Sequence, residues 1–150
     1  MRERVIQTAE RLGLRLDVRR LDAPTATVQQ AADAVGCPPR QIAKSLVFVA
    51  DGEPVLCIAS GAHRVDPERL ADVLDVAEVR QASPEEVRAA TGFAIGGVPP
   101  FGHGLDVVLD ELLLDNDVVW AAGGDEHSLF AVDPRELVRC TRASVAAVGD

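Results

Sequence analysis

Two apolar runs in the first half of the chain are KSLVFVA at residues 44–50 and PVLCIAS at residues 54–60, and they are connected through Asp51-Gly52. Both runs are short and rich in aliphatic residues, as in buried strands. An Asp-Gly pair is favoured in tight hairpin turns because the two central positions of such a turn need positive φ, which Asp and Gly tolerate. The runs therefore predict an antiparallel hairpin, and a chain that contains one does not form a purely parallel sheet.

Signals for helix starts and ends recur along the chain. An N-cap residue followed by proline at the first helical position occurs three times. Glu86 and Glu136 are placed to complete capping boxes in two of these helices. The predicted helices are residues 3–12 with Gly13 at their end, a helix opened by Thr27 with Gln30 and closed by Gly36, and helices that start at Asp66-Pro67, Ser83-Pro84 and Asp133-Pro134.

Short apolar segments between these helices are predicted to be further strands: LRLDV (14–18), VAEVR (76–80), LDVVLD (105–110), DVVWAA (117–122) and SLFAV (128–132). Helices and strands thus interleave, with no internal repeat or obvious linker. A chain of 150 residues can bury about two thirds of its unfolded surface in one domain. We expect a single α/β (α+β) domain over residues 1–150, with one mixed, strongly curved sheet surrounded by helices.

Composition narrows the class of protein. Hydrophobic residues make up 47% of the chain but aromatic residues only 3%, so the core must be largely aliphatic. No apolar run approaches the ~20 residues of a membrane span, and the charged N-terminus does not read as a signal peptide. Cys37, Cys57 and Cys140 are widely spaced and favour neither a disulfide framework nor a zinc knuckle. A cytoplasmic protein without a membrane partner is expected.

Charge is distributed unevenly along the chain. The net charge of −9 argues against a DNA-binding protein or a general nucleic-acid binder, since phosphate contacts need Lys and Arg. Residues 1–20, however, hold six arginines against three acidic residues. Arg4 and Arg11 are seven residues apart on one helix face. This segment is a candidate surface for docking one end of an RNA, and the alternative is an ordinary solvated helix face.

Lys44, within RQIAKSLVF, is the only lysine beside fourteen arginines. It stands at the start of a predicted strand, after the proline-stiffened turn CPPRQ. An ammonium is a compact charge, whereas a guanidinium is a broad planar fork. Lys44 could hold a phosphate or carboxylate, or stabilise charge on an ester carbonyl. The alternative is a strand-end lysine that reaches out to water.

The segment TGFAIGGVPPFGHG, residues 91–104, is rich in glycine and proline and is flanked by apolar strands. Gly96-Gly97 would let the backbone approach a ligand closely and turn its N–H groups inward. The stretch Val98-Pro99-Pro100 would make the next part rigid. The spacing matches neither a P-loop nor a dinucleotide-binding fingerprint. The segment predicts a shaped binding loop, with a wide turn between sheet edges as the alternative.

Histidines give a weaker signal. His127 is followed by Ser128, but adjacent strand residues point to opposite faces, and no nucleophile elbow is present. The remaining histidines, His63 and His103, lie far from it with no metal-ligand spacing, so no metal is expected. His127 remains eligible as a site residue because histidine titrates near neutral pH.

Several motifs together resemble the YbaK/prolyl-tRNA-synthetase-associated aminoacyl-tRNA editing domain family. They are QIAKSLVF, then LADVLDVAEVRQASPEEVRAATGFAIGGVPPFG, then VVLDELLL and AAGGDEHSLFAVDPRELVR, over about residues 25–142. The resemblance implies that family's fold and the hydrolysis of wrongly aminoacylated tRNA by a free-standing protein acting in trans. It also implies an aminoacyl-tRNA acceptor end as partner, an aminoacyl-tRNA synthetase as a second candidate partner, and no metal or organic cofactor.

By the same resemblance, Lys44 matches the family's essential lysine. The implied substrate-binding residues are Ser45, Gly96, Gly97, Val98, Pro99, Pro100 and His127. No protein nucleophile or general base is evident, so positioning and electrostatic stabilisation are the expected contributions, from the Lys44 charge and the amides of Gly96 and Gly97.

One position departs from the family's pattern. Relatives that clear cysteine from tRNA tend to carry a serine just before the late glycine pair, where this chain has Ala122. Alanine, serine or threonine is therefore at least as good a candidate as cysteine for the amino acid removed. A module that binds tRNA ends or a synthetase without hydrolysis is the alternative function, because such a module could keep both Lys44 and the glycine loop.

Overall fold

The computed structural model describes residues 2–149 of the chain. Its helices are α1 (Arg2–Arg11), α2 (Val28–Val35), α3 (Pro67–Leu74), α4 (Pro84–Thr91) and α5 (Pro134–Thr141), with short 3-10 helices η1 (Pro39–Gln41) and η2 (Glu111–Asp115). Its strands are β1 (Arg19–Arg20), β2 (Ala43–Ala50), β3 (Glu53–Ser60), β4 (Val79–Gln81), β5 (Val107–Asp110), β6 (Val119–Ala122), β7 (Ser128–Val132) and β8 (Ser144–Ala146).

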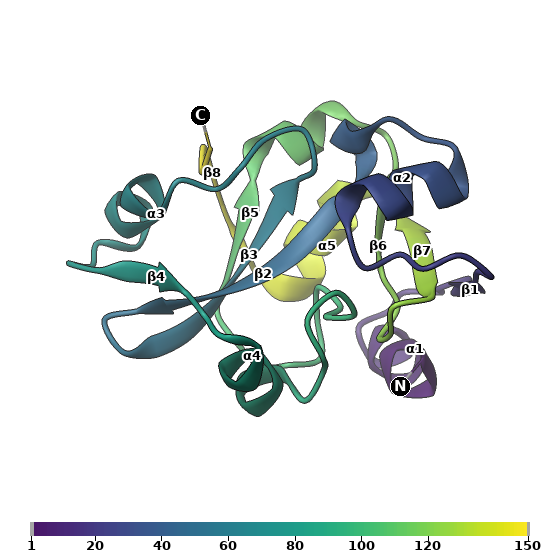
Figure 1. The fold of residues 1–150 in the computed structure, drawn as a ribbon, viewed down its shortest axis with the longest axis horizontal. Helices are drawn as coiled ribbons and strands as arrows, with labels where there is room; N and C mark the ends of the chain where they lie inside the picture. Colours follow the sequence, from purple (N-terminus) through teal and green to yellow (C-terminus); the bar gives the residue numbers. More distant parts are fainter. Residues whose placement is uncertain (1, 150) are drawn as a thin grey trace.

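The strands form two sheets rather than the single sheet that we predicted. A five-stranded sheet has the order β4-β2-β3-β5-β8, and a three-stranded sheet has the order β1-β7-β6 (Figure 1). Within the large sheet, β3–β5 and β5–β8 are parallel and the other pairs are antiparallel. The predicted α/β class and mixed pairing are confirmed, whereas the predicted strong curvature stays a prediction.

The two sheets meet at the residues just before β2. Pro38 and Pro39 lead into η1 immediately before β2, and a proline has no N–H to donate to a ladder. An isolated parallel bridge between Ile42 and Trp120 joins the residue before β2 to the small sheet. The bridge lies immediately before β2, which begins at Ala43, one residue before Lys44.

The predicted hairpin is confirmed. Asp51 and Gly52 have φ of 47° and 86°, as a two-residue turn with two left-handed positions requires. Lys44 is paired with Ala59 across the β2–β3 ladder. The Gly61 N–H donates to the Ile42 carbonyl at 2.9 Å, which extends the same ladder beyond Lys44.

Local capping signals were predicted well. Thr27 with Gln30 and Ser83 with Glu86 form complete capping boxes, and Gly36 ends α2 in the left-handed region. Asp66 and Asp133 cap α3 and α5 as predicted. The predicted box at Glu136 is wrong, because that carboxylate accepts a hydrogen bond from Arg139 instead, at 2.5 Å.

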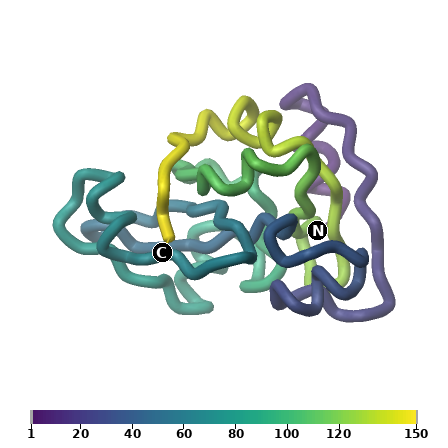
Figure 2. Tube along the Cα trace, turned by 90° about the horizontal axis from the view of Figure 1, so that it is seen from above, coloured from purple at the N-terminus to yellow at the C-terminus, as the bar shows by residue number. Residues whose placement is uncertain are grey.

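The predicted strand LRLDV at residues 14–18 is also wrong. Leu14, Leu16 and Val18 do pack against the main core, which explains the alternating pattern. Only the next two residues, Arg19 and Arg20, pair with a strand, β7. The segment instead runs along one end of the molecule between α1 and α2, as the purple trace shows (Figure 2).

The large sheet is covered on both faces. Alternate residues of β3 enter different clusters: Leu56 and Ile58 pack with α1, α4, α5 and the small sheet, while Cys57 and Ala59 pack with Leu70 of α3. This burial on both sides explains the nearly continuous apolar sequence of β3. No helix within residues 2–149 is long and apolar enough to cross a membrane.

Candidate functional site

Lys44 lies at the beginning of β2, on the sheet face that is covered by α3. The alternation of the strand places it with Leu46 and Phe48, which belong to the α3-side cluster. Its Nζ donates a hydrogen bond to the backbone carbonyl of His63 at 3.2 Å. Burial lowers the pKa of the Lys44 ammonium below its usual value, and the neighbouring Arg64 guanidinium lowers it further.

Two cavities border the first part of β2, and Lys44 and Leu46 line both. The α3 cavity has a volume of about 320 Å³ and is completed by Phe48, Arg64, Val65, Pro67 and Gln81. The glycine-loop cavity has a volume of about 270 Å³. Its other lining residues are Thr25, Ala26, Thr27, Val28, Ala31, Ile42, Ala43, Ser45, Ile95, Gly96, Val98, Trp120, Ala122 and Leu129.

Ser45 points to the opposite face of the sheet from Lys44, toward the glycine-loop cavity. Its Oγ is buried and has no hydrogen-bond partner among the described residues. A buried hydroxyl without a partner is costly, so such an atom marks a place where a ligand can supply the missing bond. The edge of β2 beside it pairs with β4 only from Phe48 onward.

The two loop glycines play different structural parts. Gly96 has a φ of +86°, and a side chain there would approach Ala26, which also lines the cavity. Gly97 packs instead against the backbone of Asp125, where an added Cβ would lie 2.9 Å from Cα. The Gly97 N–H is already engaged, since it donates to the Ala94 carbonyl at 3.0 Å. Of the two amides, Gly96 is therefore the better candidate to bind a ligand.

The three loop residues after Gly97 are all buried, but only the first of them lines the glycine-loop cavity. Val98 is buried and lines the cavity, whereas Pro99 and Pro100 are buried without lining it. The Pro100 carbonyl is hydrogen-bonded to His103 Nε2 at 3.1 Å, which closes the turn after the two prolines. Both the rigidity of the loop and its contact with a substrate stay predictions.

His127 lies in the turn before β7 and does not line the glycine-loop cavity. Its backbone fixes this turn, with the N–H donating to Asp125 Oδ1 at 2.8 Å and the carbonyl accepting from Leu21 at 2.7 Å. The Ser128 hydroxyl is buried and donates to the Asp125 carboxylate. His127 and Ser128 therefore do not form a nucleophile–base pair, and a substrate contact of His127 stays a prediction.

No sequence motif pointed to residues 25–28 as a wall of the cavity. Thr25 holds this wall in place, because its N–H and its hydroxyl both donate to the Glu126 carbonyl, at 2.5 and 2.9 Å. Trp120, also missed, closes the cavity from β6, and Arg19 stacks over its ring at 5.0 Å. Ala122 lies on the same face of β6 as Trp120 and faces the cavity, so the departure from the family's serine falls on a lining position.

The two predicted docking arginines lie on α1 and do not line the cavity. Arg4 stacks over the Phe93 ring at 5.0 Å, which brings it next to the start of the glycine-rich loop. Arg11 is exposed and donates to the Thr8 hydroxyl at 3.3 Å. Their binding to RNA stays a prediction.

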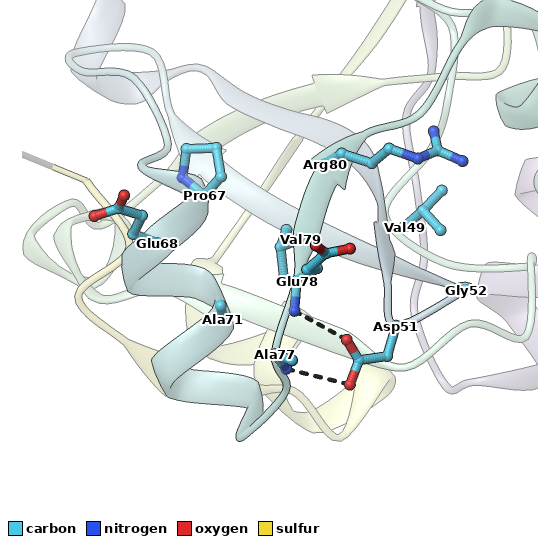
Figure 3. A pocket seen from close by; sticks show the side chains of 10 residues that line it. All are labelled: Val49, Asp51, Gly52, Pro67, Glu68, Ala71, Ala77, Glu78, Val79 and Arg80. Carbon is cyan, nitrogen blue, oxygen red and sulfur yellow. Dashed lines mark hydrogen bonds between the residues drawn. The ribbon is translucent and has the colours of Figure 1, made fainter.

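A cavity of about 510 Å³, larger than the two beside Lys44, lies between α3 and β4 (Figure 3). The Asp51 carboxylate points into this region and accepts hydrogen bonds from the N–H groups of Ala77 and Glu78. Those bonds fix the approach to β4, so the groups have a structural role. Within residues 2–149 there is also no group of three or more His, Cys, Asp or Glu side chains placed to hold a metal ion.

The family model for the aminoacyl-tRNA editing domain matches residues 22–140, which include Lys44, both cavities' main walls and the glycine loop. The chain belongs to the aminoacyl-tRNA editing domain family. An editing domain acts on aminoacyl-tRNA, so this family membership agrees with the resemblance found in the sequence.

Relatives of this editing domain include one protein that the match largely covers and much longer ligases. YwhH of Bacillus subtilis (strain 168), described as uncharacterized, is 38% identical over 124 residues, 81% of this chain and 78% of YwhH. A proline–tRNA ligase of Nitratidesulfovibrio vulgaris is 33% identical over 125 residues, 83% of this chain but only 21% of the ligase. The chain thus spans about a fifth of that ligase.

Solved structures resemble this chain over nearly its whole length. A crystal structure described as a candidate trans-editing enzyme for prolyl-tRNA synthetase is 45% identical, with a TM-score of 0.92 and coverage of 99% of this chain and 96% of that chain. The hypothetical protein APE2540 is 30% identical, with a TM-score of 0.88 and coverage of 98% and 99%. The editing-domain fold predicted from the sequence is confirmed.

Proposed function

We propose that this editing domain is a deacylase that acts in trans on tRNA carrying a wrong, small amino acid such as alanine, serine, threonine or cysteine. One observation carries the proposal: the single lysine, with its ammonium partly desolvated, borders a cavity that Gly96 and Val98 of the glycine loop also line. Removal from water strengthens the electrostatic action of an ammonium on a nearby ester or phosphate.

The proposed reaction is hydrolysis of the ester that joins the amino acid to the terminal ribose. A water molecule, or a hydroxide formed from it with help from a substrate hydroxyl, bonds to the carbonyl carbon. The bond from that carbon to the ribose oxygen then breaks, and this oxygen takes up a proton. Lys44 would stabilise the developing negative charge, and the Gly96 amide would donate to the carbonyl oxygen. Ser45 would hold the substrate through its unpartnered hydroxyl.

Preference for a small amino acid follows from the walls of the glycine-loop cavity. Ala26, Ala31, Ala43 and Ala122 present only methyl groups, and larger side chains close the space around them. At position 122 the lining offers a methyl group and no hydroxyl to a polar substrate side chain. The similarity to proline–tRNA ligases and to a candidate trans-editing enzyme for prolyl-tRNA synthetase supports tRNA for proline as the first tRNA to test.

The test is a deacylation assay on a panel of aminoacylated tRNAs. The tRNA for proline is charged with alanine, serine, cysteine or proline, and the panel also includes mischarged tRNAs for alanine and threonine. We expect turnover of at least one mischarged tRNA and none of the correctly charged tRNA for proline. Binding of these tRNAs without turnover of any would instead support the non-catalytic module. Addition of prolyl-tRNA synthetase to the same assay tests whether that enzyme is a partner.

A further inference from the structure

Asp110 ends β5 inside the protein, with 0% of its surface exposed. A carboxylate without water needs hydrogen-bond donors around it. Its Oδ2 accepts from the Ser60 N–H at 3.0 Å, and its Oδ1 accepts from the Leu112 N–H at 3.1 Å, where η2 begins. The third partner is the Nε2 atom of His63, which contacts Oδ2.

The His63 side chain is almost completely enclosed, with 11% of its surface exposed. Its ring lies against the backbone of Gly149, where an added Cβ would overlap the ring. The ring is therefore fixed by a hydrogen bond at one edge and by main-chain packing beside it. Because the ring is fixed, the backbone of His63 is fixed as well, and its carbonyl is the group that accepts from Lys44.

We propose that Asp110 and His63 form a positioning pair that sets the place of the Lys44 ammonium through the His63 carbonyl. The inference rests on the proposed function, in which Lys44 meets the substrate. Neither Asp110 nor His63 lines the two cavities beside Lys44, so the pair acts through another residue and does not touch the reacting atoms.

A lysine needs such a support more than most residues do. Its ammonium sits on a flexible four-carbon stem, and a free lysine populates many rotamers. One hydrogen bond to a fixed carbonyl selects among them and leaves two of the three N–H donors for a ligand. The charged or titratable groups that act on Lys44 are Arg64, Cys57 and Asp110, and of these only Asp110 is linked to it through His63.

The single lysine makes a direct test possible, because lysine labelled with 13C at Cε gives one side-chain signal from the whole chain. His63→Leu removes the bond to Asp110, whereas His63→Gln places an amide donor near the position of Nε2. Asp110→Asn, which keeps the shape of the carboxylate, serves as a second variant should His63→Leu not fold. His103→Leu is the matched control, since His103 is a half-buried histidine with two hydrogen bonds of its own.

For His63→Leu we expect a changed chemical shift of the Lys44 Cε signal and a pKa of Lys44 closer to the ordinary lysine value. We also expect kcat to fall by about 10- to 100-fold while KM stays nearly constant. His63→Gln should retain the signal and keep kcat within about threefold of the original. His103→Leu should leave the Lys44 signal in place. Asp110→Asn should displace the signal and lower kcat as His63→Leu does.

An unmoved Lys44 signal in folded His63→Leu or Asp110→Asn protein would overturn the proposal, whatever happens to Tm. Equal losses of kcat in His63→Leu and His63→Gln would overturn it too, because the rescue by a hydrogen-bonding side chain would be missing. The signal is read without substrate. If no tRNA is deacylated but the signal moves as expected, the positioning pair stands and the proposed function fails.

Discussion

Replacing Ser45 by alanine should stabilise the free protein and weaken its activity at the same time. The Ser45 hydroxyl is buried without a partner, and leaving a buried hydroxyl unpaired costs about 1–3 kcal/mol. Alanine removes that cost and takes away only one oxygen atom, so we expect a gain of about 1 kcal/mol in the free energy of unfolding. For a domain of this size, such a gain raises Tm by about 2–4 °C.

The same substitution should lower kcat/KM if the hydroxyl bonds the substrate. A neutral hydrogen bond contributes about 0.5–1.5 kcal/mol, which corresponds to a loss of about two- to thirteen-fold. Urea denaturation measures the first effect, and deacylation of a mischarged tRNA measures the second. Ser128→Ala is the matched control, because the buried Ser128 hydroxyl donates to the Asp125 carboxylate and its removal should destabilise the protein.

Destabilisation of Ser45→Ala to the extent seen for Ser128→Ala would refute the reasoning, since the hydroxyl would then be satisfied in the free protein. A more stable variant with unchanged kcat/KM would show that the hydroxyl does not meet the substrate. The two readouts together separate a structural serine from a binding one.

Three further substitutions and one change of pH have defined outcomes. Gly97→Ala should lower the free energy of unfolding by about 1–3 kcal/mol and reduce activity in parallel, because its Cβ meets the Asp125 backbone; an unchanged Tm would contradict this. Arg11→Gln should raise KM for tRNA, and each lost phosphate contact should reduce the slope of log affinity against log salt concentration by about 0.7–0.9. Arg4→Gln should have the same effects and should also change kcat, because Arg4 stacks on Phe93 beside the glycine loop. A minimal aminoacyl-adenosine should not respond to Arg11→Gln, and equal losses on both substrates would place the docking surface elsewhere. Enzymatic kcat/KM should fall as pH rises through a midpoint below 10.5, because burial lowers the pKa of Lys44; a midpoint at or above 10.5 would contradict the desolvated ammonium.

Local chemistry made much of this fold predictable. The Asp51-Gly52 turn and the capping boxes at Thr27 and Ser83 are decided by neighbouring residues, and all three are present as predicted. The family resemblance, carried by Lys44 and the glycine loop, pointed to the editing domain that the comparisons show.

Long-range features were not predictable in this way. The sequence cannot show that residues 14–18 find no neighbouring strand, or that the sheet divides at the bridge between Ile42 and Trp120. The contact of Gly97 with Asp125 joins residues far apart in the sequence. The contact between His63 and Asp110 could not be predicted either, because the two residues are 47 positions apart in the sequence. The spacing of the histidines excluded only a metal site.

Single-turnover deacylation of a mischarged tRNA by the original protein, Lys44→Ala and Lys44→Arg tests the central claim most directly. All three proteins should unfold within about 0.5 kcal/mol of one another, because one partly exposed ammonium contributes little to stability. We predict hydrolysis by the original protein and only the spontaneous rate with either variant, since a guanidinium keeps the charge but not the compact shape. Near-normal hydrolysis by Lys44→Ala would show that the ammonium does not carry the reaction, and near-normal hydrolysis by Lys44→Arg would remove the explanation of the single lysine.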